Sequence, residues 1–183
     1  PSRGGACSSP FSLQHKPMPA RYSIGIDLGT TNSVLAHVEL GAENAPIQVL
    51  PVPQHTATAS VEPRPLLPSF LYLGTPEEAE RGAFRLPWGT PAYAVGEGAR
   101  RQAAEVPTRT VAGAKSWLAN PRVDRRQPIL PWNAPDDVPK VSPVEASRRY
   151  LEHLVAAWAH AHPEAPLSEQ QVVLTVPASF DAA

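Results

Sequence analysis

The chain has 183 residues, of which 42% are hydrophobic and 18% charged, so its composition is globular and its length allows one domain with a buried core. Sixteen lysines and arginines against seventeen acidic residues give a formal charge of -1, which argues against nucleic acid as a partner. A single cysteine, Cys7, excludes an intramolecular disulfide, and no Cys/His cluster has the spacing of zinc ligands.

The first residues of the chain differ from the rest. Residues 1–20 are rich in Ser, Gly and Pro and have no periodicity, so we interpret them as a disordered tail or as sequence upstream of the true start at Met18. They contain no apolar signal core, and no apolar run of about 18 residues occurs later. We therefore expect a cytoplasmic protein without membrane contact, folded over residues 21–183.

Alternating apolar residues predict short strands in the first half of the chain. Tyr, Ile, Ile and Leu alternate over residues 22–28, and the apolar run at 33–38 follows closely enough for the two to form a hairpin. Further strands are expected at 47–52, 69–73 and 93–95.

Helices are predicted next along the chain. Residues 96–105 form a helix whose first turn contains acidic Glu97, and residues 111–119 form a short helix that carries Lys115 and ends before Pro121.

The clearest helix starts at Ser142 and Pro143, because the apolar residues that follow recur at spacings of three and four. The residues of this stripe are Ala146, Tyr150, Leu151, Leu154, Val155 and Trp158. Residues 171–176 then form an apolar, β-branched strand whose two faces we expect to be buried. Strand hairpins, then helices, then a returning strand predict a mixed α/β layer structure.

The strongest functional signal is the string IGIDLGTTNS at residues 24–33. Gly29 suits a tight turn, and the small side chains of Thr30, Thr31 and Asn32 leave backbone amides open to phosphate oxygens. Asp27 supplies a carboxylate that would hold Mg²⁺ through its waters. The string lacks the P-loop pattern, and Asp-x-Gly by itself is also ordinary turn chemistry.

Five segments of the chain resemble motifs of one known protein family. YSIGIDLGTTNSVLA resembles the first phosphate motif of the DnaK-like seventy-kilodalton heat-shock chaperones, which are ATPases of the actin and sugar-kinase superfamily. LPSFLYL, VGEGARRQA, TVAGAKSWL and VVLTVPASF are similar, in order, to later motifs of that family, so the resemblance extends from Tyr22 to the end of the chain. Leu67 and Ser179 depart from it, standing where the family has threonine and tyrosine.

The resemblance implies an α/β fold with a mixed sheet and helices, an incomplete actin-like or ribonuclease H-like ATPase lobe whose upper subdomain spans roughly residues 52–142. Pro-rich insertions at 74–91, which has no usable period, and at 120–143 would enlarge that subdomain. In the site it implies, Asp27 positions the Mg²⁺ waters, and Gly29, Thr30, Thr31 and Asn32 bind the phosphates of ATP or ADP.

Two further roles come from the same resemblance. By this resemblance Lys115 would be the catalytic lysine acting on the γ-phosphate, and Pro177 would relay the nucleotide state to a substrate domain. The complete protein would couple ATP hydrolysis to the binding of unfolded polypeptides, with J-domain and nucleotide-exchange cochaperones as partners. The alternatives are an actin-like filament or cell-shape ATPase and a small-molecule kinase of the same superfamily. A second phosphate loop does not occur in the sequence, so the chain by itself is not expected to hydrolyse ATP.

Overall fold

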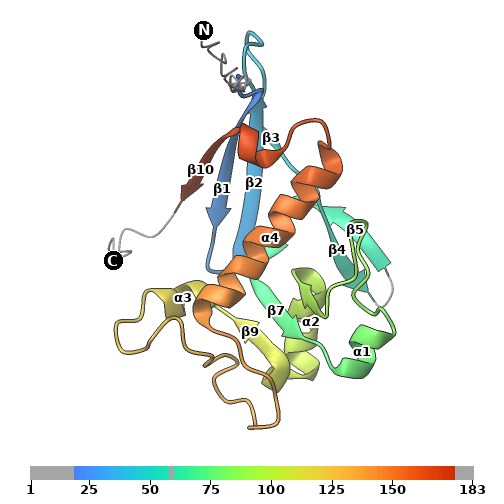
Figure 1. Cartoon of the computed structure of the whole chain (residues 1–183), viewed down its shortest axis with the longest axis vertical. Helices are drawn as coiled ribbons and strands as arrows, with labels where there is room; N and C mark the ends of the chain where they lie inside the picture. The colour runs from blue at the N-terminus through green and yellow to red at the C-terminus, as the bar shows by residue number, and fades with distance from the viewer. Residues whose placement is uncertain (1–18, 58–59, 176–183) are drawn as a thin grey trace, which may run out of the picture.

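The computed structural model describes residues 19–57 and 60–175, which form a mixed α/β arrangement, as the sequence predicts (Figure 1). The strands of this part are β1 (Tyr22–Leu28), β2 (Asn32–Glu39), β3 (Gln48–Val49), β4 (Val52–Ala57), β5 (Ser60–Arg64), β6 (Leu67–Pro68), β7 (Phe70–Leu73), β8 (Tyr93–Val95), β9 (Thr110–Ala112) and β10 (Gln171–Thr175). Its α-helices are α1 (Pro76–Glu80), α2 (Glu97–Glu105), α3 (Ala114–Leu118) and α4 (Pro143–Ala161). Short 3₁₀ turns lie at Pro107–Arg109 and Leu167–Glu169.

The strands form three sheets. The largest has the order β10-β1-β2-β3, with β6 also paired to β2; β1 is antiparallel to β2 and parallel to β10. The hairpin β4-β5 forms the second sheet, and the third has the antiparallel order β8-β7-β9. Helix α4 crosses the β1-β2 hairpin and also contacts β4, β7 and β8, so it joins the three sheets (Figure 1).

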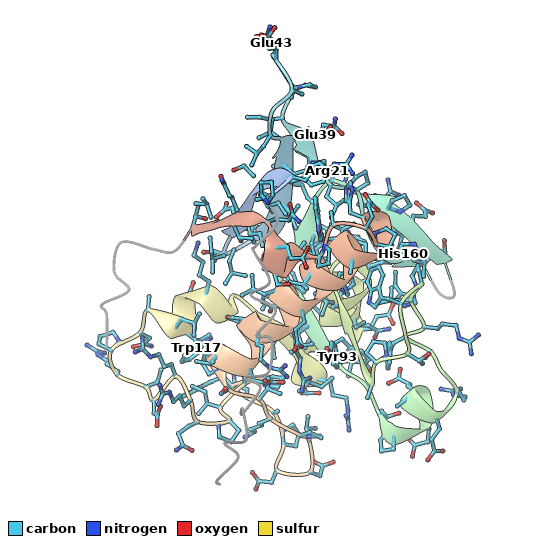
Figure 2. All side chains as sticks on the ribbon, turned by 45° about the horizontal axis from the view of Figure 1, so that its top comes forward. Arg21, Glu39, Glu43, Tyr93, Trp117 and His160 are labelled. Carbon is cyan, nitrogen blue, oxygen red and sulfur yellow. The ribbon has the colours of Figure 1, made fainter. Side chains whose placement is uncertain are left out.

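The β1-β2 hairpin follows the predicted alternation. In β1 the residues Tyr22, Ile24, Ile26 and Leu28 are buried and the residues between them are not. The register pairs Leu28 with Ser33, and because β2 starts at Asn32, residues 29–31 connect the strands. At the opposite end of the hairpin, Arg21 and Glu39 form an exposed ion pair, with 2.9 Å between Nε and Oε1 (Figure 2).

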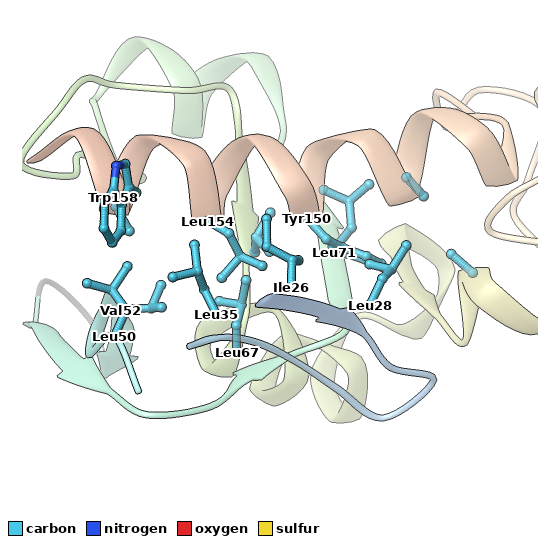
Figure 3. Packing of buried hydrophobic residues seen from close by; sticks show 14 of the residues in the cluster. Ile26, Leu28, Leu35, Leu50, Val52, Leu67, Leu71, Tyr150, Leu154 and Trp158 are labelled. Atoms are coloured by element: carbon cyan, nitrogen blue, oxygen red, sulfur yellow. The ribbon is translucent and has the colours of Figure 1, made fainter. Parts of the chain in front are cut away.

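Helix α4 begins where its sequence predicts. The Ser142 hydroxyl accepts a hydrogen bond from the amide of Glu145 at 3.0 Å, and Pro143 occupies the first turn. Val155 is 39% exposed and Leu151 only partly buried, so the buried stripe is narrower than predicted. Figure 3 shows three large side chains of this helix facing the apolar residues of the strands: Tyr150, Leu154 and Trp158.

Two predicted boundaries are wrong, and one segment for which no element is predicted contains a helix. The predicted helix at 111–119 is strand β9 followed by α3, because Gly113 has a positive φ of 64° and separates the two. The predicted strand at 47–52 divides into β3 and the start of β4. Segment 74–91 contains α1, whose Thr75 and Glu78 form a reciprocal capping box.

The burial predicted for the last strand is also wrong. Val172, Val173 and Leu174 of β10 are 41%, 62% and 41% exposed, respectively. The cause is position: within the described ranges β10 is paired on one side only, and α4 packs over β1 and β2. No helix among the described residues combines the length and apolar character needed to cross a bilayer.

Candidate functional site

The turn between β1 and β2 is the candidate site. Asp27 is the second-last residue of β1, Gly29, Thr30 and Thr31 form the turn, and Asn32 begins β2. A Cβ atom at Gly29 would lie 2.0 Å from the carbonyl oxygen of Asn32, so the turn requires glycine there. The structure thus brings these five predicted residues together at one end of the hairpin.

The turn presents polar groups outward. Thr30 and Thr31 are exposed, whereas Asn32 is partly buried. Within the described ranges, no group accepts a hydrogen bond from the backbone amide of Thr30 or Thr31. Two exposed hydroxyls and two open amides on a short turn suit an anion with several oxygen atoms, such as a polyphosphate.

Ser69, which lies just before β7, holds the inner side of the turn. Its hydroxyl donates a hydrogen bond to the Gly29 carbonyl oxygen at 2.8 Å, and its amide donates to the Thr31 carbonyl oxygen at 2.9 Å. The hydroxyls of Ser69 and Ser33 are also hydrogen-bonded, with 3.0 Å between the oxygens. The first and third residues of the turn are therefore both tied to one residue.

The Asp27 carboxylate is oriented by the neighbouring strand. The register of the parallel pair sets Asp27 opposite Thr175, whose hydroxyl donates a hydrogen bond to Asp27 Oδ1 at 2.6 Å. Asp27 is exposed, so its carboxylate also remains accessible to water. One oriented, hydrated carboxylate beside a turn with open amides fits Mg²⁺ held through water next to a polyphosphate.

Lys115 lies on α3, the helix that follows the last strand of the β8-β7-β9 sheet. β7, which follows Ser69, pairs with β9 so that Phe70 faces Ala112, and β9 leads through Gly113 into α3. Lys115 is the second residue of that helix and is partly exposed. The register therefore brings the start of the lysine's helix close to the residue that holds the turn.

Sequence reasoning missed three residues of this site. Ser69 binds the turn, Ser33 binds Ser69, and Thr175 binds Asp27, yet the sequence analysis gives none of them a role. Ser69 lies in LPSFLYL, so a signal was present, although nothing in the sequence shows which carbonyl a serine contacts. The predicted relay residue, Pro177, lies outside the described residues. Among those residues, no group of three or more His, Cys, Asp or Glu side chains could hold a metal ion.

The chain is similar to chaperones along almost all of its length. It is 32% identical to Chaperone protein HscA of Enterobacter sp. (strain 638) and to that of Serratia proteamaculans (strain 568), over 93% of this chain and 25% of each relative. It is 33% identical to the Chaperone protein HscA homolog of Actinobacillus pleuropneumoniae serotype 5b, over 91% of this chain and 24% of that protein. No family model matches the chain.

These relatives confirm the resemblance to the seventy-kilodalton heat-shock chaperone family. The match supports an N-terminal part of such a chaperone. The chain spans about a quarter of the length of the curated relatives it matches.

Proposed function

We propose that the chain supplies the first phosphate-binding turn of an ATP-dependent, DnaK-like chaperone and belongs to an actin-like ATPase lobe. The observation that carries the proposal is the turn itself, in which Thr30 and Thr31 face outward with open amides beside the exposed carboxylate of Asp27. The names of the relatives support a chaperone over a filament protein or a small-molecule kinase.

In this proposal each residue of the site has a distinct task. The amides and hydroxyls of Thr30 and Thr31, with Asn32, bind oxygens of the β- and γ-phosphates. Asp27 accepts hydrogen bonds from the waters of a bound Mg²⁺, which would offset the charge of the phosphates. Lys115 places a positive charge where the transferred phosphoryl group and the attacking water meet, so it stabilises charge that develops in the transition state.

The wider function belongs to the complete protein. There, ATP hydrolysis would drive cycles of binding and release of unfolded polypeptides in the cytoplasm, assisted by J-domain and nucleotide-exchange cochaperones. Residues 52–142 would form the upper subdomain over the nucleotide, and Pro177 would relay the state of the site to the substrate domain. The relatives' name, chaperone, supports this assignment in general terms.

The test is the metal dependence of ATP binding in the full-length protein that contains this chain. Asp27→Asn keeps the shape of the side chain and removes its charge, so it should weaken binding of ATP with Mg²⁺ much more than binding without it. Asp136→Asn, at an exposed residue in the 120–143 segment, is the matched control and should change neither affinity. Equal losses for Asp27→Asn in the two conditions, or a wild type that binds no ATP, would contradict the proposal.

A further inference from the structure

The hydrogen bonds around Ser69 run in one direction. A carbonyl oxygen can only accept, so the single hydroxyl hydrogen of Ser69 is donated to Gly29, and the hydroxyl of Ser33 must donate to Ser69 Oγ. Ser33 is 0% and Ser69 2% exposed, so water does not compete well for these bonds. Two consecutive hydrogen bonds therefore run, from donor to acceptor, from Ser33 to Ser69 and from Ser69 to Gly29, the first residue of the turn.

These hydrogen bonds determine which way the turn faces. The peptide bond between Gly29 and Thr30 is trans, and a trans peptide points its N–H opposite to its C=O. Because Ser69 draws the Gly29 carbonyl inward, the Thr30 amide points outward. The second bond, from the amide of Ser69 to the carbonyl of Thr31, secures the far side of the same turn.

The same residue connects the turn to the segment of Lys115. Ser69 directly precedes β7, whose first residue, Phe70, pairs with Ala112 at the end of β9. Gly113, the N-cap residue, then leads into α3. A shift of Ser69 would therefore move two parts of the site relative to each other.

We propose that Ser69, supported by Ser33, is a positioning residue that fixes the 29–31 turn in its phosphate-binding conformation and aligns it with the segment of Lys115. The inference rests on the proposed function, because it assumes that the turn binds phosphate. Ser69 does not touch the nucleotide itself. Its contribution is to remove alternative conformations of the turn before ATP binds, which raises affinity without a new contact.

The experiment compares two buried serines in the full-length protein. Ser69→Ala should weaken ATP binding about tenfold, because a turn without this hydrogen bond of about 1.4 kcal/mol adopts other conformations that ATP binding must reverse, and should leave binding of adenosine, which has no phosphates, unchanged. Ser147→Ala is the matched control, because Ser147 is 6% exposed and its hydroxyl also donates to a backbone carbonyl, that of Pro143, at 2.9 Å. It should reduce thermal stability to a similar extent and change neither affinity.

A second variant keeps the test decisive if Ser69→Ala does not fold. Ser33→Ala removes the hydroxyl that donates to Ser69 but leaves the hydrogen bond from Ser69 to Gly29. It should therefore weaken ATP binding about threefold and leave adenosine binding unchanged. A wild type that binds no ATP would overturn the proposed function and this inference with it. A wild type that binds ATP, with unchanged affinity in the serine variants or equal losses for ATP and adenosine, would overturn this inference alone.

Discussion

His153 of α4 donates a hydrogen bond from Nε2 to the backbone carbonyl oxygen of Pro53 in β4, 2.9 Å away. The imidazole is 6% exposed, and Trp88 packs edge-on against it at a centroid distance of 5.2 Å. The pKa of His153 is lowered to about 4, mainly by burial; the coulombic effect of nearby His55 acts in the same direction, and the Pro53 hydrogen bond opposes both. A neutral histidine thus links the long helix to the second sheet.

The first prediction is a loss of stability in mild acid that depends on His153. Its pKa is lower in the folded state than in the unfolded state, where it is near 6.5, so the unfolded state binds more protons as pH falls. The contribution is complete above about pH 6.5 and should be lost between there and about pH 4, by roughly 3 kcal/mol. Denaturant unfolding at several pH values, for wild type and His153→Gln, measures the difference.

The variant and its control separate this effect from other titrations. His153→Gln retains a donor but cannot take up a proton, so its stability should fall less over that range. His160→Gln, at an exposed position of the same helix (Figure 2), should follow the wild type. If His153→Gln and wild type lose stability in parallel, His153 does not account for acid sensitivity.

The second prediction concerns Gln54, a fully buried side chain that accepts a hydrogen bond from the first residue of α2. Its Oε1 accepts a hydrogen bond from the amide of Glu97 at 2.9 Å, and its Nε2 donates to the carbonyl of Leu66 at 2.9 Å. Gln54→Ala leaves both backbone groups without these partners, so the free energy of unfolding should fall by about 3 kcal/mol. Exposed Gln127→Ala should cost less than about 0.5 kcal/mol in the same denaturant titration. Similar losses for the two variants would argue against the role given to Gln54.

The local pattern of the chain predicts the elements with a strong period. The alternation of β1 and the three-and-four spacing of α4 are visible over at least seven residues, and both elements occur as expected. Helix α1 has five residues, too few to show a period, although Thr75 and Glu78 carry its capping signal. The exposure of β10 depends on its neighbours in space, so its apolar composition misleads.

The residues of the candidate site also differ in how well the local sequence predicts them. Asp27 and the turn after it are contiguous in sequence, so their pattern could be recognised. Ser69 and Gln54 act on groups 40 and 43 residues away, and a serine or glutamine has no local feature that reveals such a partner. Such long-range contacts are visible only in the folded structure.

The third prediction tests Lys115 in the full-length protein. Because the lysine should act on charge that develops in the transition state, Lys115→Ala should lower single-turnover ATP hydrolysis by about a hundredfold or more and leave ATP affinity nearly unchanged. Lys140→Ala, at another partly exposed lysine, is the control and should alter neither quantity. Unchanged hydrolysis in Lys115→Ala would remove this residue from the site.

The last prediction concerns the exposed strand β10 in the 183-residue chain expressed alone. Val172, Val173 and Leu174 expose apolar surface on a strand whose described partner is β1. Such an edge favours association with another chain, because it offers both unpaired backbone groups and apolar side chains. Sedimentation velocity over a range of concentrations should therefore show concentration-dependent oligomers.

A charged residue on this edge should reverse the association. Val173, the most exposed of the three at 62%, is replaced in Val173→Lys, which adds charge repulsion between paired strands and should shift the chain toward monomer. Val144→Lys, at a valine of α4 that is 41% exposed, adds the same charge elsewhere and should leave the association as in wild type. Equal effects of the two variants would indicate that net charge, and not β10, governs solubility. A wild-type chain that stays monomeric at every concentration would contradict the prediction that β10 is an edge strand through which chains associate.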